Sequence, residues 1–190
     1  MDTVYGKYEN SKNPTERILI ECNVKSLPVD IFLIANKYEI NIMRNKDAGA
    51  ILGGKLGATL FCNGKPIIVY DDKLDTETKL ITIAHEVGHI VLGHPLKDGM
   101  LARTFSLTDP RIEKAANIFA QRLLAPFPVL LGLGLRTAEE IASTCSIPID
   151  IARDRAKKIE SYGKNSYIQF SPIEKNVYEQ FRGFVESRAG

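Results

Sequence analysis

Hydrophobic and polar positions along the chain follow two periods, one typical of helices and one typical of strands. In residues 26–40 the apolar side chains recur at helical spacing, with Ser26 suited to the cap and Pro28 to the first turn. From Ile40 onward, this pattern gives way to short runs rich in β-forming residues, at 40–45, 58–62 and 66–71. The pattern therefore predicts a helix followed by a small set of strands.

The connection between the last two of these strands carries the strongest local signal. Asn63 and Gly64 both tolerate the positive φ of a type I′ turn, so they predict a tight hairpin. The glycine-rich segment 48–58 that precedes the hairpin has no Gly-Lys-Ser/Thr ending and no helix after it. We interpret it as a loop or a strand edge rather than a phosphate loop.

Helical periodicity returns after Asp75 or Thr76 and ends at Gly93. Residues 94–108 are expected to form a loop, and a further helix is expected to begin at Asp109–Pro110. The histidine-containing segment 81–94 is therefore placed on a helix.

The last third of the chain is expected to be mostly helical. Thr137 with Glu140, and Ser171 with Glu174, match the capping box that begins a helix. The final helix carries an apolar stripe, which indicates core packing. Its members are Ile173, Val177, Phe181, Phe184 and Val185.

These elements divide the chain into three parts. Residues 1–16 are polar and are expected to be loosely held, and the pattern of 17–25 is too short to assign. We predict an N-terminal extension over 1–25, a core domain with both helices and strands over 26–135, and a mostly helical region over 136–190.

Composition and charge argue against several classes of function. The 190 residues are 44% hydrophobic and 25% charged, as in an ordinary globular protein, and the net charge of +2 gives no strong attraction to nucleic acid or anionic membranes. Cys22, Cys62 and Cys145 are widely spaced and odd in number, so we expect buried reduced thiols rather than disulfides or a thiolate metal site. Neither a signal-peptide core nor a run long enough to cross a bilayer is present, which makes the cytoplasm the expected compartment.

The chemistry is concentrated in "HEVGH", residues 85–89. On a helix, His85 and His89 project from one face with Cβ atoms roughly 5 to 6 Å apart, so their imidazoles can bind one metal ion. Glu86 lies about 100° around the helix from His85 and can serve as general base to a metal-bound water. Gly88 inside this helix costs roughly 0.5 to 1 kcal/mol relative to alanine, which suggests a close approach at that turn.

A catalytic zinc site needs a third protein ligand beside an open position. The extended histidine motif places glycine three and histidine six residues after the second histidine, whereas Gly93 and His94 stand four and five residues after His89. His94 is therefore expected at the helix C-terminus. Glu113 on the next helix fits the third ligand best; the alternative is that it faces solvent. Asn117, one turn further on, could orient a ligand or serve as a surface residue.

The segments "TIAHEVGHIVLGH" and "EKAANIFAQRLLAP" resemble the paired signatures of the ImmA/IrrE family of zinc metallopeptidases. "LPVDIFLIANKYEI" also resembles that family's N-terminal helix, so the resemblance covers roughly residues 26–160. It implies a zincin-like metallopeptidase core, with a small antiparallel or mixed sheet packed on the motif helix. It further implies Zn²⁺ bound by His85, His89 and Glu113, with Glu86 as catalytic base. One departure is Ala125, where the family usually has methionine.

The resemblance implies a function as well as a site. The best-described activity of that family is cleavage of a cytoplasmic helix-turn-helix repressor, which suggests an anti-repressor protease whose partner is such a repressor. A further donor for the developing oxyanion is expected from a tyrosine or arginine; Tyr162 and Tyr167 are two of several candidates.

Two other functions remain open. Residues 139–160 have the outline of a helix-turn-helix, with Ser146 where glycine is usual, which would suit a DNA-binding regulator. Residues 137–190 carry eight acidic and eight basic side chains, however, whereas DNA-binding proteins concentrate positive charge, so nucleic acid is not the expected partner. The other alternative is a regulator that binds a repressor through a structural metal site without cutting it, but simple binding gives Glu86 no role.

Overall fold

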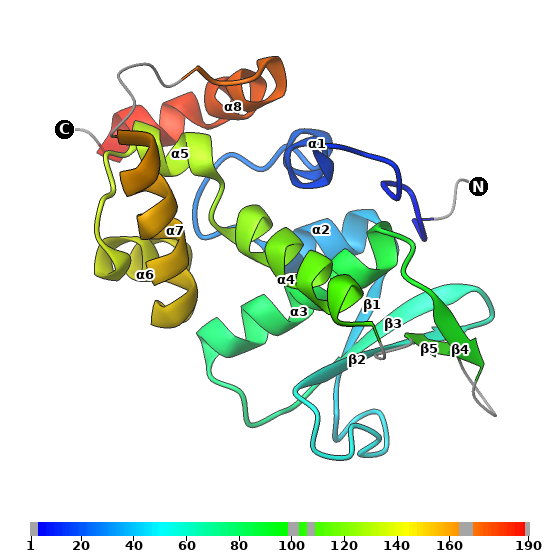
Figure 1. Cartoon of the computed structure of the whole chain (residues 1–190). Coiled ribbons are helices and arrows are strands. Elements are labelled where there is room, and N and C mark those ends of the chain that lie inside the picture. The colour runs from blue at the N-terminus through cyan, green and yellow to red at the C-terminus, as the bar shows by residue number, and fades with distance from the viewer. Residues whose placement is uncertain (1–3, 99–102, 106–108, 164–168, 189–190) are drawn as a thin grey trace. The chain divides into compact units, whose positions relative to one another are not determined.

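The computed structural model describes residues 4–98, 103–105, 109–163 and 169–188 (Figure 1). Contacts within the chain divide it into two compact units. One unit comprises residues 1–14 and 31–120, and the other comprises residues 15–30 and 121–190. The division at 1–25, 26–135 and 136–190 expected from the sequence stays a prediction.

The first unit is built on a mixed sheet. Its described strands lie in the order β1-β3-β2-β5-β4, with β1 parallel to β3 and the other neighbours antiparallel. The bounds are β1 Asn41–Arg44, β2 Gly57–Cys62, β3 Lys65–Tyr70, β4 Leu96–Asp98 and β5 Arg103–Phe105. The three strands expected from the hydrophobic pattern are confirmed.

The β2–β3 turn forms as its residues require. Asn63 and Gly64 have φ of 51° and 76°, the positive values of the expected hairpin turn. The turn sets a register in which Leu60 lies opposite Ile67. Ile68 and Val69 of β3 are fully buried and form part of the core of this unit.

Helix α3, Thr76–Val91, packs against β2 and β3. Asp75 caps its first turn by accepting a hydrogen bond from the Thr78 N–H at 2.7 Å. The helix ends before Gly93, whose φ of 67° leaves the helical region. The segment that carries the histidines is therefore helical, as expected.

Residues 4–8 are more firmly held than the polar composition of 1–16 suggested. The Gly6 and Tyr8 N–H groups donate to the carbonyls of Ile90 and Val91 at 2.9 and 2.8 Å. Tyr8 is also buried, at 5% exposure. The expectation of a loose leader was therefore wrong for these residues, because the carbonyls at the end of a distant helix bind them.

Two further expectations were wrong in part. Helix α2, Ile31–Lys37, begins later than predicted because Leu27 and Val29 are buried from a non-helical segment. The expected loop 94–108 contains β4 and β5, which pair with each other, while β5 also pairs with β2. Three-residue strands have too few positions to show a period, so only tertiary pairing reveals them.

The second unit is helical. Its helices are α1 Pro14–Glu21, α5 Phe127–Gly132, α6 Ala138–Cys145, α7 Ile149–Gly163 and α8 Pro172–Arg188. The Thr137–Glu140 capping box is present, and Ser171 and Glu174 exchange the bonds of a second one. In the stripe of α8, Val177, Phe181 and Val185 are buried, as expected for core packing.

Helix α4, Pro110–Leu124, begins at the predicted proline. Together with α5 it forms a stretch, 110–132, that is long and apolar enough to cross a membrane. However, 56% of its apolar window is buried within the protein, and core helices pass the same test of length and composition. The stretch is therefore weak support for a membrane span, and the cytoplasm stays a prediction.

The α+β fold expected from the sequence is confirmed, with a small mixed sheet on the histidine helix and a largely helical last third. Within the described residues the three cysteines form no disulfide; Cys22 and Cys145 are buried, and Cys62 is half-buried. Burial raises the pKa of the Cys145 thiol to about 12, so this thiol stays protonated at neutral pH.

Candidate metal centre

Two histidines of α3 and one glutamate of α4 bring their ligand atoms to one point. The Nε2 atoms of His85 and His89 lie 2.9 Å apart. They lie 3.4 and 3.5 Å from the two carboxylate oxygens of Glu113, and the three residues form a group that could hold a metal ion. Atoms that ligate one tetrahedral ion at about 2.0–2.1 Å are about 3.4 Å from one another. The two histidine–carboxylate distances match this spacing, and the distance between the two histidine nitrogens is shorter.

The approach of α4 depends on small residues on both helices. A Cβ atom on Gly88 would lie 2.8 Å from a ring carbon of Phe119 and 3.4 Å from the Cα of Ala116. Ala116 and Phe119 are buried at 0% and 2% exposure. A glycine at position 88 destabilises α3 by itself, but it lets α4 come close enough to bring Glu113 to the histidines.

A neighbour contacts the second ring nitrogen of each histidine. His85 Nδ1 lies 2.8 Å from the amide oxygen of Asn117. Because that oxygen only accepts, Nδ1 carries the proton and Nε2 keeps its lone pair. His89 Nδ1 lies 2.9 Å from His94 Nδ1, and the tautomer that leaves His89 Nε2 able to ligate donates from Nδ1 to His94.

Burial keeps His89 and His94 neutral. It lowers the pKa of His89 to about 3, with further lowering from His85 and His94, and burial also lowers the pKa of His94. A neutral His94 can accept the proton of His89 Nδ1, and a neutral His89 can offer Nε2 to a cation. Nε2 of His89 can therefore bind a cation without first losing a proton.

The fit of a metal ion is supported by an atom of Glu113. Its Oε1 is buried and has no hydrogen-bond partner among the described residues, although it lies 3.5 Å from His89 Nε2. When His85 and His89 are in the tautomers that can ligate, their Nε2 lone pairs and the Glu113 carboxylate face one another. These groups repel one another unless a cation lies between them. Two histidines and one carboxylate are also a ligand set that zinc takes in catalytic sites.

Glu86 lies beside this cluster from the same helix, 8% exposed. The Thr59 hydroxyl donates to its Oε2 at 2.7 Å. Burial raises the pKa of the Glu86 carboxyl, and the hydrogen bond from Thr59 partly opposes that rise. The hydrogen bond fixes one carboxylate oxygen and leaves Oε1 for a reacting group.

The start of β2 leaves room for that carboxylate. A Cβ atom on Gly57 would lie 2.5 Å from the Thr82 side chain and 3.6 Å from the Cγ of Glu86. Only a glycine lets the strand come so close to α3 at this position. The sequence analysis did not single out Gly57 or Thr59. The available signal was for Thr59, a threonine at an inward position of an apolar strand.

The placement of the other candidate residues is mixed. Asn117 contacts the predicted ligand His85, as expected if it orients that ligand. His94 lies just past the end of α3, as expected, but it is buried with its ring 4.7 Å from that of His89. Its partner is another histidine rather than the helix carbonyls. Tyr167 and the side chain of Tyr162 lie outside the described residues.

A protein-family model matches about two thirds of the chain. The family model described as IrrE N-terminal-like domain, Peptidase_M78, matches residues 35–157. No curated protein matches the chain significantly. The matched range covers α3 and α4, and with them the histidine pair, Glu86 and Glu113, in agreement with the expected zincin-like fold.

Proposed function

Since the chain belongs to the family with the IrrE N-terminal-like domain, Peptidase_M78, we propose that it is a zinc-dependent endopeptidase. The observation that carries this proposal is the convergence of His85, His89 and Glu113 beside the buried carboxylate of Glu86. Three protein ligands leave one position of a tetrahedral ion open, as hydrolysis requires.

The protein residues would divide the work. A bound Zn²⁺ supplies a Lewis acid that polarises the peptide carbonyl and activates water. Glu86 takes a proton from the attacking water and passes it to the leaving amine, a role that typically contributes 10²- to 10⁴-fold. Thr59 orients the Glu86 carboxylate, while Asn117 and His94 hold the rings of the two histidine ligands.

For the substrate, we propose a cytoplasmic helix-turn-helix repressor. The support is the resemblance of "HEVGH" and "EKAAN" to the signatures of the ImmA/IrrE family, whose best-described activity this is. On this proposal the protein is an anti-repressor that releases transcription by cutting its partner.

The DNA-binding alternative has one structural observation in its favour. Helices α6 and α7 flank Ser146 in the left-handed conformation, which gives the outline of a helix-turn-helix. Arg155, one of the basic residues of α7, is only 5% exposed and donates to the Ala125 carbonyl at 2.6 Å. A buried arginine cannot contact phosphates, so this pair of helices supports packing better than DNA binding.

The decisive experiment compares three proteins on candidate repressors. Wild type, Glu86→Gln and Glu77→Gln are incubated with each repressor, with and without a chelator, and fragments are identified by mass spectrometry. Glu77 is an exposed carboxylate in the first turn of the same helix, so its variant controls for loss of a charge.

We expect wild type and Glu77→Gln to cut in a chelator-sensitive way and Glu86→Gln to leave the repressor intact. If all three proteins disrupt repression without fragments, the chain acts by binding and not by proteolysis. Less than about a tenth of an equivalent of zinc in the purified protein would count against the metal site itself.

A further inference from the structure

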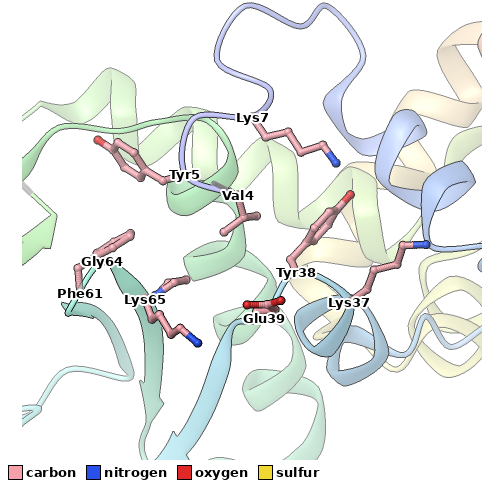
Figure 2. A pocket seen from close by; sticks show the side chains of 10 residues that line it. Val4, Tyr5, Lys7, Lys37, Tyr38, Glu39, Phe61, Gly64 and Lys65 are labelled. Atoms are coloured by element: carbon pink, nitrogen blue, oxygen red, sulfur yellow. The ribbon is translucent and has the colours of Figure 1, made fainter. Parts of the chain in front are cut away.

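A cavity of about 420 Å³ lies in the first unit, lined by residues 4–7, the end of α2 and the β2–β3 turn (Figure 2). Its volume falls in the range of about 300–1,000 Å³ typical of small-molecule sites. None of His85, Glu86, His89 and Glu113 lines it. The cavity is therefore a separate feature from the metal centre.

One part of the cavity wall is aromatic. The rings of Tyr5 and Phe61 meet edge to face, with centroids 5.4 Å apart and planes at 81°. Phe61 is 9% exposed, and the neighbouring Pro66 is also buried. Figure 2 shows Tyr5 and Phe61 together on one side of the cavity. Such a surface suits a planar ring, which aromatic side chains contact by edge or face.

The charged residues of the lining are mostly positive. Lys7, Lys37 and Lys65 contribute three positive charges and Glu39 one negative charge, a local excess of two. The ammonium of Lys7 lies 4.9 Å from the centroid of the Tyr38 ring, a cation–π contact that positions the ammonium at this wall of the cavity. The small net charge of the whole chain hides this local concentration.

The surrounding strands favour a small molecule over a peptide. A peptide that binds by adding a strand needs an unpaired strand edge. Here β3 lies between β1 and β2, and β2 lies between β3 and β5, so both strands of the turn already have two neighbours. The cavity therefore offers side-chain contacts to a compact ligand rather than backbone contacts to an extended one.

We propose that this cavity binds a small organic anion that carries a planar ring. The ring lies against Tyr5 and Phe61, and the anionic group lies among Lys7, Lys37 and Lys65. This binding does not require the peptidase reaction, so it can be tested without a substrate.

The test uses two fluorescent probes on the full chain. 1-Anilinonaphthalene-8-sulfonate carries a sulfonate, and N-phenyl-1-naphthylamine has the same rings without the charge. We expect wild type to bind the sulfonate about 3- to 100-fold more tightly, since each of the three exposed charge contacts contributes about 0.2–1 kcal/mol, or about 1.4- to 5-fold. Equal affinity for the two probes would overturn the proposal.

Substitutions then locate the site. In Lys7→Gln/Lys37→Gln/Lys65→Gln the preference for the sulfonate should disappear, while binding of the neutral probe is kept. The matched control replaces the exposed Lys46, Lys73 and Lys175, which do not line the cavity, and should bind like wild type. A triple cavity variant that keeps the preference would also overturn the proposal.

Glu39→Gln should change the affinity for the sulfonate probe in the opposite direction. Removing the negative charge of the lining should tighten sulfonate binding by about 1.4- to 5-fold. Because 1-anilinonaphthalene-8-sulfonate also binds the exposed apolar surface of loosely packed proteins, the comparison uses a variant whose near-UV circular dichroism matches that of wild type. If Glu39→Gln leaves sulfonate affinity unchanged or weakens it, the charge of this cavity does not select the ligand and the proposal fails.

Discussion

Two regions of the molecule follow local sequence rules to different degrees. One is the cluster of histidines and glutamates where α3 meets α4, and the other is the group of helices α6–α8. In the cluster, a glycine lies inside a helix, a carboxylate is buried and His89 contacts two other histidines. In α6–α8, helices begin at capping boxes and the apolar stripe faces the interior. Sequences that break local rules mark functional sites, whereas consistent ones specify stable folds. The comparison predicts that substitutions in the cluster change activity and those in α6–α8 change stability.

The largest expected effect is a loss of cleavage rate caused by a substitution in the cluster, at Glu86. Glu86→Gln should lower the rate of repressor cleavage by about 10²- to 10⁴-fold, because the amide cannot accept a proton. Its melting temperature should not fall, since the amide oxygen still accepts from Thr59 and a buried charge is removed. Calorimetry and cleavage rates on the same sample check both halves. A variant that unfolds as it loses activity would break the contrast.

Among substitutions in α6–α8, the largest expected effect is on the free energy of unfolding. Phe181→Ala should lower the free energy of unfolding by about 3–5 kcal/mol, because Phe181 is fully buried. Phe184 on the same helix is only half-buried, so Phe184→Ala should cost clearly less. Urea titration followed by circular dichroism measures both variants. Both should keep the zinc content of wild type, and a loss of zinc at constant folding would contradict the comparison.

A middle-sized effect concerns the orientation of the base. Thr59→Val keeps the shape of the side chain but removes the donor to Glu86, a loss of about 1–3 kcal/mol, or about 5- to 150-fold in kcat. Thr59→Ser keeps a hydroxyl and should recover most of the rate with KM little changed. Steady-state kinetics on the cleaved repressor decide. If the valine and serine variants behave alike, the hydroxyl has no orienting role.

Two helix glycines sharpen the comparison further. Gly88→Ala puts a Cβ atom 2.8 Å from Phe119 and should cost about 1–3 kcal/mol of stability. It should also weaken zinc binding by displacing Glu113. Gly183 in α8 has open space at its Cβ position, so Gly183→Ala should stabilise by about 0.5–1 kcal/mol. Thermal melts should shift in opposite directions for the two alanines, and zinc competition titrations should show weaker binding for Gly88→Ala only.

The smallest effect is a pH dependence in α6. Hydrogen bonds from the Thr137 and Arg136 backbone lower the pKa of the exposed Glu140 carboxyl. The folded pKa is below the unfolded one, so this carboxylate stabilises the fold above the unfolded pKa and loses its effect as pH falls through the folded pKa. Glu140→Gln should melt below wild type at pH 7, with a gap that narrows towards pH 3. A constant gap would contradict this account.

Much of the fold and site could be predicted because the signals are local. The Asn63–Gly64 turn, the Asp75 cap and the "HEVGH" spacing each depend on a few neighbouring residues. Strands β4 and β5, the Thr59 contact and the partner of His94 depend on segments distant in sequence. No local period encodes such contacts, so they became visible only in three dimensions.

The docking of residues 4–8 on the end of α3 also bears on how the protein folds. The Tyr5 hydroxyl donates to the His94 carbonyl at 2.9 Å across 89 positions of sequence, and Gly6 approaches Gly93 closely. Closing so long a loop is entropically costly, and such contacts form slowly compared with a hairpin or a single helix. We therefore expect the end of α3, and His94 just after it, to pack late in folding. Because His94 contacts the ring of the predicted ligand His89, binding of a metal ion should follow the docking of residues 4–8.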